Sequence, residues 1–328
     1  MVKKKWEETV KIQKQQAMRN VLYALTPLVL ASVYLFGWRF VAVYLVVVAA
    51  GLVCEWFMAK RYDLKVTESL FVSCTLFALS LPPGFPLWMA ALGISFGVVF
   101  GKMVFGGFGK NVFNPAITAR AFVYISFGVP MTARFIPPVT SVGNWFPGGF
   151  GTWLSPLDSI SAATPLVAKD ASLLNLFLGN VSGSFGETSA LLIILGGAFI
   201  IWKKAASWRI VTGSIASFLL FQSILWLAGV GSAVNPLYAL LSGGFLLASF
   251  FMITDPVSSS QSTNEGRWIY GIIFGTLTVL IRVFANWAEG VTFAILLANM
   301  FGPLFDHLLK TAKANRKKLA QESKGGAA

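Results

Sequence analysis

Residues 41–59 read VAVYLVVVAAGLVCEWFMA, a run of nineteen residues with one charged side chain, Glu55. A transmembrane helix needs about 20 predominantly apolar residues, so this run predicts one crossing of a lipid bilayer. Comparable apolar runs lie at residues 21–37, 41–59, 69–81, 87–105, 113–128, 188–202, 210–228, 237–253, 268–285 and 291–309. The sequence therefore predicts an all-α, polytopic membrane helix bundle with about ten spans.

The composition agrees with a chain that lies in a membrane. Hydrophobic residues make up 56% of the 328 residues and charged residues only 12%, whereas soluble domains carry about a quarter charged residues. The net charge of +13 comes largely from Lys and Arg that flank the apolar runs, as the positive-inside rule describes. The basic residues therefore predict an orientation in the membrane, and we do not expect nucleic-acid binding.

The same rule divides the chain into five regions. These are a basic cytoplasmic N-terminus (1–20), a first five-helix repeat (21–128), an extracytoplasmic loop (129–187), a second five-helix repeat (188–309) and a basic cytoplasmic tail (310–328). We expect residues 21–37 to be a retained signal-anchor, because no small-residue cleavage site follows them. The predicted location is the inner (cytoplasmic) membrane, with both termini in the cytoplasm.

Two stretches of the chain share one plan, in which an apolar run is broken and a later run carries an asparagine. They are residues 76–122, with the break Pro82-Pro83-Gly84 and then Asn114, and residues 250–301, with the break Thr254-Asp255-Pro256 and then Asn299. Each stretch lies late in a half of five spans, and an odd number of spans inverts the second half relative to the first. Broken helices in such inverted repeats are typical of membrane pathways.

The predicted loop contains Asp158-Ser159-Ile160-Ser161-Ala162-Ala163-Thr164, which composition alone describes as a Ser/Ala-rich turn. The pattern D-x-x-S-[G/A/Q]-A-T nevertheless resembles the flavinylation signature of the Rnf/Nqr family of redox-driven ion pumps. The resemblance implies that the Thr164 hydroxyl carries FMN through a phosphodiester. It also implies that Asp158, Ser161 and Ala163 belong to the segment that a flavin transferase recognises.

Other motifs extend the resemblance over most of the chain: Ser80-Leu81-Pro82-Pro83, GGFGKNVFNPA at 106–116, LSGG at 241–244, FMITDPV at 251–257 and LLAN at 296–299. They resemble the D subunit of the Rnf ferredoxin:NAD⁺ oxidoreductase and its homologue, the B subunit of the sodium-pumping NADH:quinone reductase. The short N-terminus favours Rnf, whereas the tail Pro303–His307 resembles Nqr, and we favour Rnf. The implied function is a flavin-bearing subunit that relays electrons in redox-driven Na⁺ or H⁺ translocation.

The chain does not carry the other redox sites of such a complex. Its cysteines, Cys54 and Cys74, are too few for an iron–sulfur cluster, which needs about four ligands. His307 is the only histidine, so we expect no metal site and no catalytic triad, and no G-x-G-x-x-G fingerprint occurs in a strand–turn–helix context. We therefore expect partner subunits to hold the Fe–S and NAD(H) sites.

The chemistry of the side chains suggests two further candidate sites. Glu55 is the only acidic residue well inside an assigned span, which makes it a candidate for the ion path. The glycine-rich segment before Asn114 favours a tight turn between helices. Its alternative is a second flavin site, a non-covalent riboflavin near Lys110, Asn111 and Asn114, as the resemblance to Nqr implies.

Two interpretations from other functional classes stay open. The inverted five-plus-five plan resembles the urea-transporter fold, so the chain could be a passive channel that needs no cofactor. It could also be a scaffold subunit. Covalent flavin on Thr164 distinguishes the leading interpretation from both.

Overall fold

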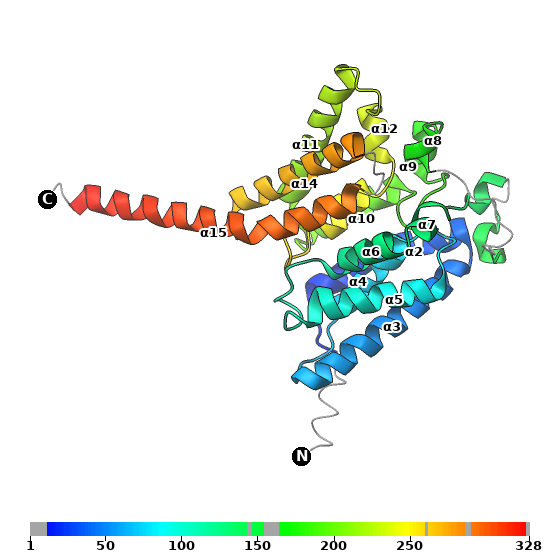
Figure 1. Ribbon diagram of the computed structural model, residues 1–328, viewed down its shortest axis with the longest axis horizontal. Coiled ribbons are helices and arrows are strands. Elements are labelled where there is room, and N and C mark those ends of the chain that lie inside the picture. Colours follow the sequence, from blue (N-terminus) through cyan, green and yellow to red (C-terminus); the bar gives the residue numbers. More distant parts are fainter. Residues whose placement is uncertain (1–11, 143–145, 154–163, 260–261, 286–289, 326–328) are drawn as a thin grey trace, which may run out of the picture.

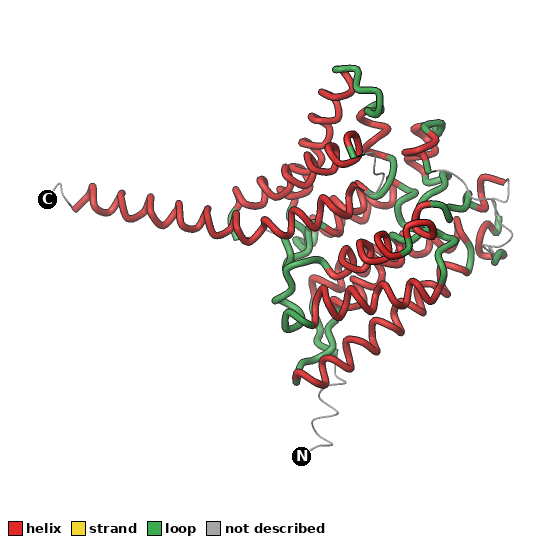
Figure 2. Tube along the Cα trace, in the orientation of Figure 1, coloured by secondary structure: helices red, strands yellow, loops and turns green. Residues whose placement is uncertain are grey.

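The computed structural model describes residues 12–142, 146–153, 164–259, 262–285 and 290–325. The regular secondary structure of this part of the chain is helical, apart from isolated β-bridges between Gln13 and Thr67 and between Gly37 and Trp153. Helices fit the apolar runs because they satisfy every backbone polar group within the segment. The all-α prediction is confirmed (Figures 1 and 2).

Five helices of the described chain are long and apolar enough to cross a bilayer: α2 (Gln16–Phe36), α3 (Arg39–Tyr62), α11 (Trp208–Leu227), α14 (Asn264–Phe284) and α15 (Gly290–Gly325) over its part Gly290–Arg316. The shorter apolar helices are α4 (Ser69–Leu79), α5 (Leu87–Val98) with the π-helix η1 (Val99–Met103), α6 (Pro115–Ser126) and α10 (Ala190–Trp202). Every predicted run is thus at least partly helical. The chain is a polytopic bundle that mixes full-length and short helices.

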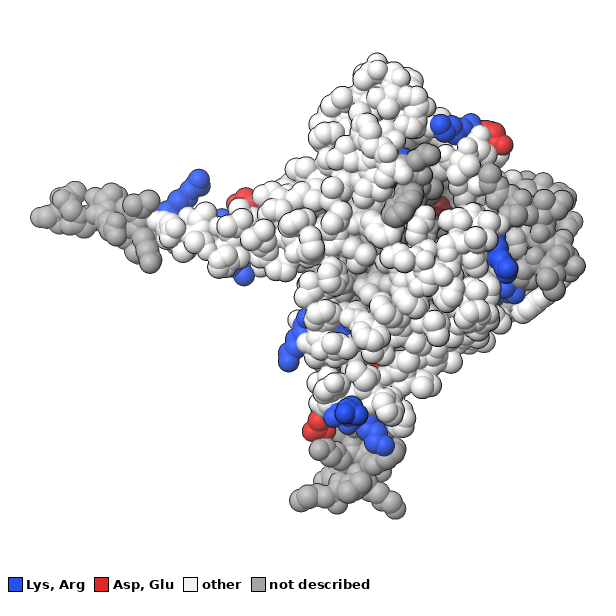
Figure 3. All heavy atoms as spheres, viewed as in Figure 1, with Lys and Arg blue, Asp and Glu red and all other residues white. Residues whose placement is uncertain are grey.

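The surface of the bundle suits lipid. Large apolar side chains such as Leu45, Val53 and Leu220 are more than half exposed. Figure 3 shows a broad uncharged face, with Lys and Arg gathered toward its ends. Contiguous exposed apolar surface of this kind marks a membrane or protein interface.

The prediction of one continuous span at 237–253 is wrong. The segment consists of α12 (Pro236–Leu241), α13 (Phe245–Leu247) and the π-helix η4 (Ala248–Met252). Ser242 is extended, and Gly243 has a φ of 69°, a left-handed conformation that favours glycine. The apolar pattern on both sides concealed this break in the sequence.

The predicted loop 129–187 holds several short helices in its described part: α7 (Gly128–Thr132), η2 (Val139–Val142), η3 (Gly148–Gly151), α8 (Pro165–Ala168) and α9 (Leu173–Leu178). In Figure 1 they gather at the end of the bundle opposite the projecting part of α15. Trp38 anchors this region, because its Nε1 donates to Phe150 O at 2.7 Å and its backbone N to Thr152 O at 3.2 Å. The described part of the loop around η3 is therefore packed onto the bundle.

The turn before α4 is tied to the start of α2. Arg19 Nη2 lies 2.6 Å from Glu68 Oε1, and the backbone N of Gln15 donates to the other carboxylate oxygen. The hydrogen bond from Arg19 lowers the pKa of Glu68 below its usual value. This contact lies toward the end of the bundle that carries the N-terminus.

Helices α11 and α14 pack closely through the G-x-x-x-G pair Gly271 and Gly275. A Cβ atom at Gly271 would collide with the carbonyl oxygen of Ile210, and one at Gly275 with that of Ser214. Small residues let membrane helices approach at backbone distance, where packing replaces the missing hydrophobic drive. This pair therefore sets the α11–α14 interface.

We expect Gly275→Ala to lower the free energy of unfolding by about 1–3 kcal/mol, because the added methyl group must push against backbone. Thermal unfolding in detergent, followed by tryptophan fluorescence, measures the loss. Gly231→Ala is the matched control, since no atom lies within 4 Å of its Cβ position. Equal stability of the two variants would contradict close packing at Gly275.

Candidate functional site

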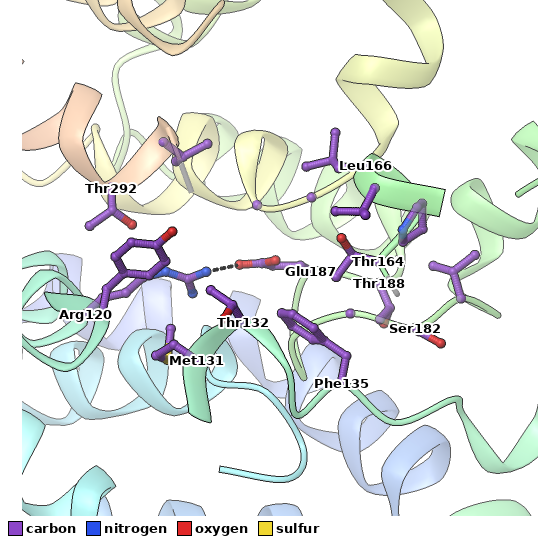
Figure 4. Close-up of a pocket in the computed structure, with 18 of the residues that line it drawn as sticks. Arg120, Met131, Thr132, Phe135, Thr164, Leu166, Ser182, Glu187, Thr188 and Thr292 are labelled. Carbon is purple, nitrogen blue, oxygen red and sulfur yellow. Dashed lines mark ion pairs between the residues drawn. The ribbon is translucent and has the colours of Figure 1, made fainter. Parts of the chain in front are cut away.

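A cavity of about 360 Å³ lies where α6, the segment 129–188, the break between α12 and α13 and the start of α15 meet. Sites for small molecules measure roughly 300–1,000 Å³. Its walls are largely apolar, with Met131, Phe135 and Leu166 among the lining residues, and Thr164 lines it too (Figure 4). The residue predicted to carry FMN therefore faces a cavity large enough for a small ligand.

The backbone leaves the Thr164 side chain available at this cavity. Thr164 is extended (φ −73°, ψ 156°) immediately before α8, and its carbonyl accepts from the backbone N of Val167 and of Ala168. Its side chain makes no capping hydrogen bond to α8, which begins at Pro165. Tyr238 Oη donates to Pro165 O at 2.9 Å and fastens α8 to α12. The recognition residues Asp158, Ser161 and Ala163 lie outside the described residues.

A buried ion pair spans the same cavity. Arg120 Nη2 of α6 lies 3.0 Å from Glu187 Oε1, and the two side chains are only 6% and 11% exposed. Arg120 also donates to the carbonyl of Ser80, the residue that follows α4. A Cβ atom at Gly244 would lie 2.6 Å from Glu187 Oε1, so the glycine break in the 237–253 segment makes room for the carboxylate.

The broken end of α4 also builds the site. Helix ends leave carbonyl groups without an intrahelical partner, and in apolar surroundings each must find another. Gly186 N donates to Leu79 O at 2.7 Å and Phe185 N to Leu81 O at 3.1 Å. These bonds hold the backbone just before Glu187 against α4. The predicted Pro-Pro-Gly break thus positions the acidic half of the ion pair.

Arg120 lies inside the apolar run 113–128, where a charged residue is a candidate for function, whereas the sequence does not single out Glu187. It lies in a polar stretch of the predicted loop, where an acidic residue is unremarkable. Gly244, which lies opposite Glu187, was visible in the sequence without indicating what it faces.

The candidate ion-path residue Glu55 has a buried partner. Lys102 Nζ lies 2.7 Å from Glu55 Oε2, with side-chain exposures of 2% and 1%. The same ammonium donates to Thr67 Oγ1 at 2.7 Å and Ser69 Oγ at 3.0 Å. Thr67 donates to the other carboxylate oxygen from both its backbone N and its hydroxyl. Glu55 is thus held in a closed polar cluster, and its role in ion transport stays a prediction.

The candidate riboflavin residues are only partly together. Asn111 and Asn114 line a second cavity of about 40 Å³ with Lys102 and Asp255, but Lys110 is not among its lining residues. This volume suits a few water molecules, at roughly 10–15 Å³ each. It is far smaller than cavities that hold small molecules. A tight turn precedes it, with positive φ at Gly106, Gly107 and Gly109.

The two asparagines at corresponding places in the predicted repeats touch each other. Asn114 N donates to Asn299 Oδ1 at 3.1 Å, and Asn114 Nδ2 donates to Met252 O at 3.1 Å. Asn299 Nδ2 donates in turn to Ser258 O and to Tyr270 Oη. These amides satisfy backbone groups where helices are interrupted, and they join the two halves of the chain.

We expect Asn299→Ala to lower the free energy of unfolding by about 1–3 kcal/mol, because it leaves buried polar partners unsatisfied. Asn315→Ala, on the exposed part of α15, is the control and should leave stability unchanged. Thermal unfolding in detergent measures both. If Asn299→Ala is as stable as the control, the Asn299 amide does not stabilise the fold.

The described residues hold no group of three His, Cys, Asp or Glu that could bind a metal ion. Cys54 and Cys74 are free thiols, and Cys74 is buried.

Relatives of known name are similar over most of the chain. The B subunit of the Na(+)-translocating NADH-quinone reductase of Stutzerimonas stutzeri is 40% identical over 285 residues, and that of Pseudomonas aeruginosa is 41% identical over 285 residues. That of Klebsiella pneumoniae is 40% identical over 297 residues. Each match covers 85% of this chain and 68% of the relative. The model of the NQR2, RnfD, RnfE family matches residues 7–315, and the chain therefore belongs to this family.

Proposed function

We propose that this chain is the flavin-bearing membrane subunit of a redox-driven Na⁺- or H⁺-translocating oxidoreductase, with FMN joined to the Thr164 hydroxyl. The observation that carries the proposal is the position of Thr164 on a cavity of about 360 Å³ with largely apolar walls. Membership of the NQR2, RnfD, RnfE family supports it. Bound FMN would supply one- or two-electron transfer without leaving the protein.

The chain's own residues fit such a group. The Thr164 hydroxyl provides the ester oxygen, and Tyr238 holds the backbone of the following residue. Met131, Phe135 and Leu166 give apolar surface that excludes water from a flat aromatic ring, and Arg120 gives a buried cation. Apolar walls with a few convergent polar groups are typical of cofactor sites.

The proposal needs partners. Other membrane and peripheral subunits would hold the Fe–S and NAD(H) sites and deliver electrons, and a flavin transferase would attach FMN. We propose the inner membrane as the location, with both termini cytoplasmic and the Thr164 loop outside, on the positive-inside rule. The relatives are named as subunits of a complex, which supports the need for partners.

The Rnf and Nqr complexes catalyse different reactions, so the reaction shows which of the two complexes contains this chain. The sequence motifs led us to favour Rnf, whereas the relatives carry the name of the Na(+)-translocating NADH-quinone reductase and favour the alternative. The complex purified through this chain decides the question. Na⁺-stimulated quinone reduction by NADH would assign it to Nqr, and NAD⁺ reduction by reduced ferredoxin to Rnf.

In-gel flavin fluorescence tests the covalent cofactor. The full chain, co-expressed with a flavin transferase and denatured, should give a fluorescent band. A urea-transporter-like channel and a cofactor-free scaffold would both give none. Urea flux into proteoliposomes would then separate the channel from the scaffold.

We also propose Glu55 as a carboxylate of the ion path, because it is an acidic group buried deep in the bundle. Removing it alone would strand the Lys102 charge, so the test is the matched pair Glu55→Gln/Lys102→Met. We expect the double variant to assemble but to lose ion uptake into vesicles by more than tenfold. Uptake at the normal rate would limit Glu55 to a structural role.

A second flavin, a non-covalent riboflavin near Lys110, Asn111 and Asn114, completes the proposal. The cavity at the two asparagines would have to widen to accept it. Extraction of non-covalent flavin from the native protein and from Asn111→Ala and Asn114→Ala variants tests the site. Unchanged recovery from both variants would exclude it.

A further inference from the structure

The cavity beside Thr164 has an unusual charge arrangement. Of the described residues that line it, Arg120 and Glu187 are the only charged ones, and they are paired with each other. Figure 4 shows the two side chains pointing toward one another across the cavity. The remaining walls are mostly apolar or carry hydroxyl groups. Among the lining residues, this pair is therefore the part that responds electrostatically to a charge that a ligand gains there.

The pair is unfavourable to bury, so its presence in the cavity needs a reason. Desolvation of two charges commonly offsets most of their attraction, and a buried ion pair is weak evidence for stability. Several features of the molecule also hold the pair in place. The arginine is bound to the Ser80 carbonyl, the segment before Glu187 to α4, and Gly244 leaves the space that the carboxylate fills.

We propose that Arg120 and Glu187 set the reduction potential of the flavin at Thr164. The inference rests on the proposed function and extends it to the control of the cofactor. Reduction adds electrons to the isoalloxazine ring, and a fixed cation in a poorly screened cavity favours the added negative charge. Arg120 raises the potential, and Glu187 holds Arg120 in place while it limits that rise.

The two halves of the pair should act in opposite directions. Glu187→Gln leaves the Arg120 charge unbalanced and should raise the potential. Arg120→Gln leaves the acidic group unbalanced and should lower the potential. Arg120→Lys keeps the positive charge. Its flavin reduction potential should lie between that of Arg120→Gln and that of the native protein. Thr132→Val changes a lining residue whose hydroxyl donates to Gly128 O and should not shift the potential.

Spectroelectrochemical titration of the full chain, matured with its flavin transferase and reduced by dithionite, measures these shifts. A Thr164→Val preparation gives the blank for any non-covalent flavin. We expect Glu187→Gln to change the reduced-to-oxidised ratio at a fixed potential by about tenfold, which is ~30 mV for a two-electron couple.

The outcomes separate the two proposals. No covalent flavin on the native chain would overturn the proposed function and this inference with it. Covalent flavin whose potential is unmoved in both Glu187→Gln and Arg120→Gln would overturn the inference alone and make the pair a structural brace. Shifts of the same sign in both variants would also overturn it, because a general loss of packing does not depend on the sign of the charge removed.

Discussion

Thr164→Val is expected to abolish covalent flavin on this chain completely. Valine has nearly the shape of threonine, but it lacks the oxygen that would form the ester with the FMN phosphate. Because the Thr164 side chain makes no capping hydrogen bond to α8, the substitution removes the attachment atom without removing a local structural bond. In-gel fluorescence of the denatured full chain should fall to background.

Controls separate chemistry from folding. Thr132→Val loses a hydroxyl in the same cavity and should stay fluorescent. Thr164→Ser keeps a hydroxyl and should retain part of the signal. A fluorescent Thr164→Val band would contradict attachment at this residue. Loss of the Thr132→Val band as well would point to a collapsed cavity instead.

The second large effect is expected at the buried pair of Glu55 and Lys102. Lys102→Met leaves the carboxylate without its cation and should lower the free energy of unfolding by about 3–5 kcal/mol, the usual effect of an uncompensated buried charge. Thr67 would still donate to Glu55, but its hydrogen bonds cannot replace an ammonium at 2.7 Å. The measurement is thermal unfolding in detergent, together with the yield of assembled protein.

Glu55→Gln in the Lys102→Met background should restore most of the lost stability. The glutamine oxygen can still accept from the Thr67 backbone N, and no charge stays buried. Lys110→Met, on the nearby turn, is the control for losing a lysine and should have little effect. If the double variant is no more stable than Lys102→Met alone, charge is not the cause of the loss.

Much of the architecture could be predicted because a segment that crosses a bilayer must satisfy its backbone hydrogen bonds internally, which favours helices. The predicted apolar runs form helices, apart from the break in 237–253, and the proline breaks at Pro82 and Asn114-Pro115 coincide with helix ends in the structure. The contact between Asn114 and Asn299 agrees with the shared plan of the two stretches. The inverted relation of the two halves stays a prediction.

The pairings could not be predicted. Arg120 and Glu187 lie far apart in the chain, as do Glu55 and Lys102, and one sequence contains no signal that joins them. The break at Ser242–Gly244 was hidden for a different reason. Apolar residues flank it on both sides, and only the structure shows that Gly244 makes room for Glu187 while Gly243 adopts a positive φ.

Mass spectrometry of one peptide tests the central claim most directly. Trypsin should release residues 135–169, which contain Thr140, Thr152 and Thr164, from the mature full chain. The peptide is expected to carry the mass of FMN less one water, and fragmentation should locate this mass on Thr164. An unmodified peptide from protein matured with an active transferase, or the added mass on another residue, would contradict the assignment.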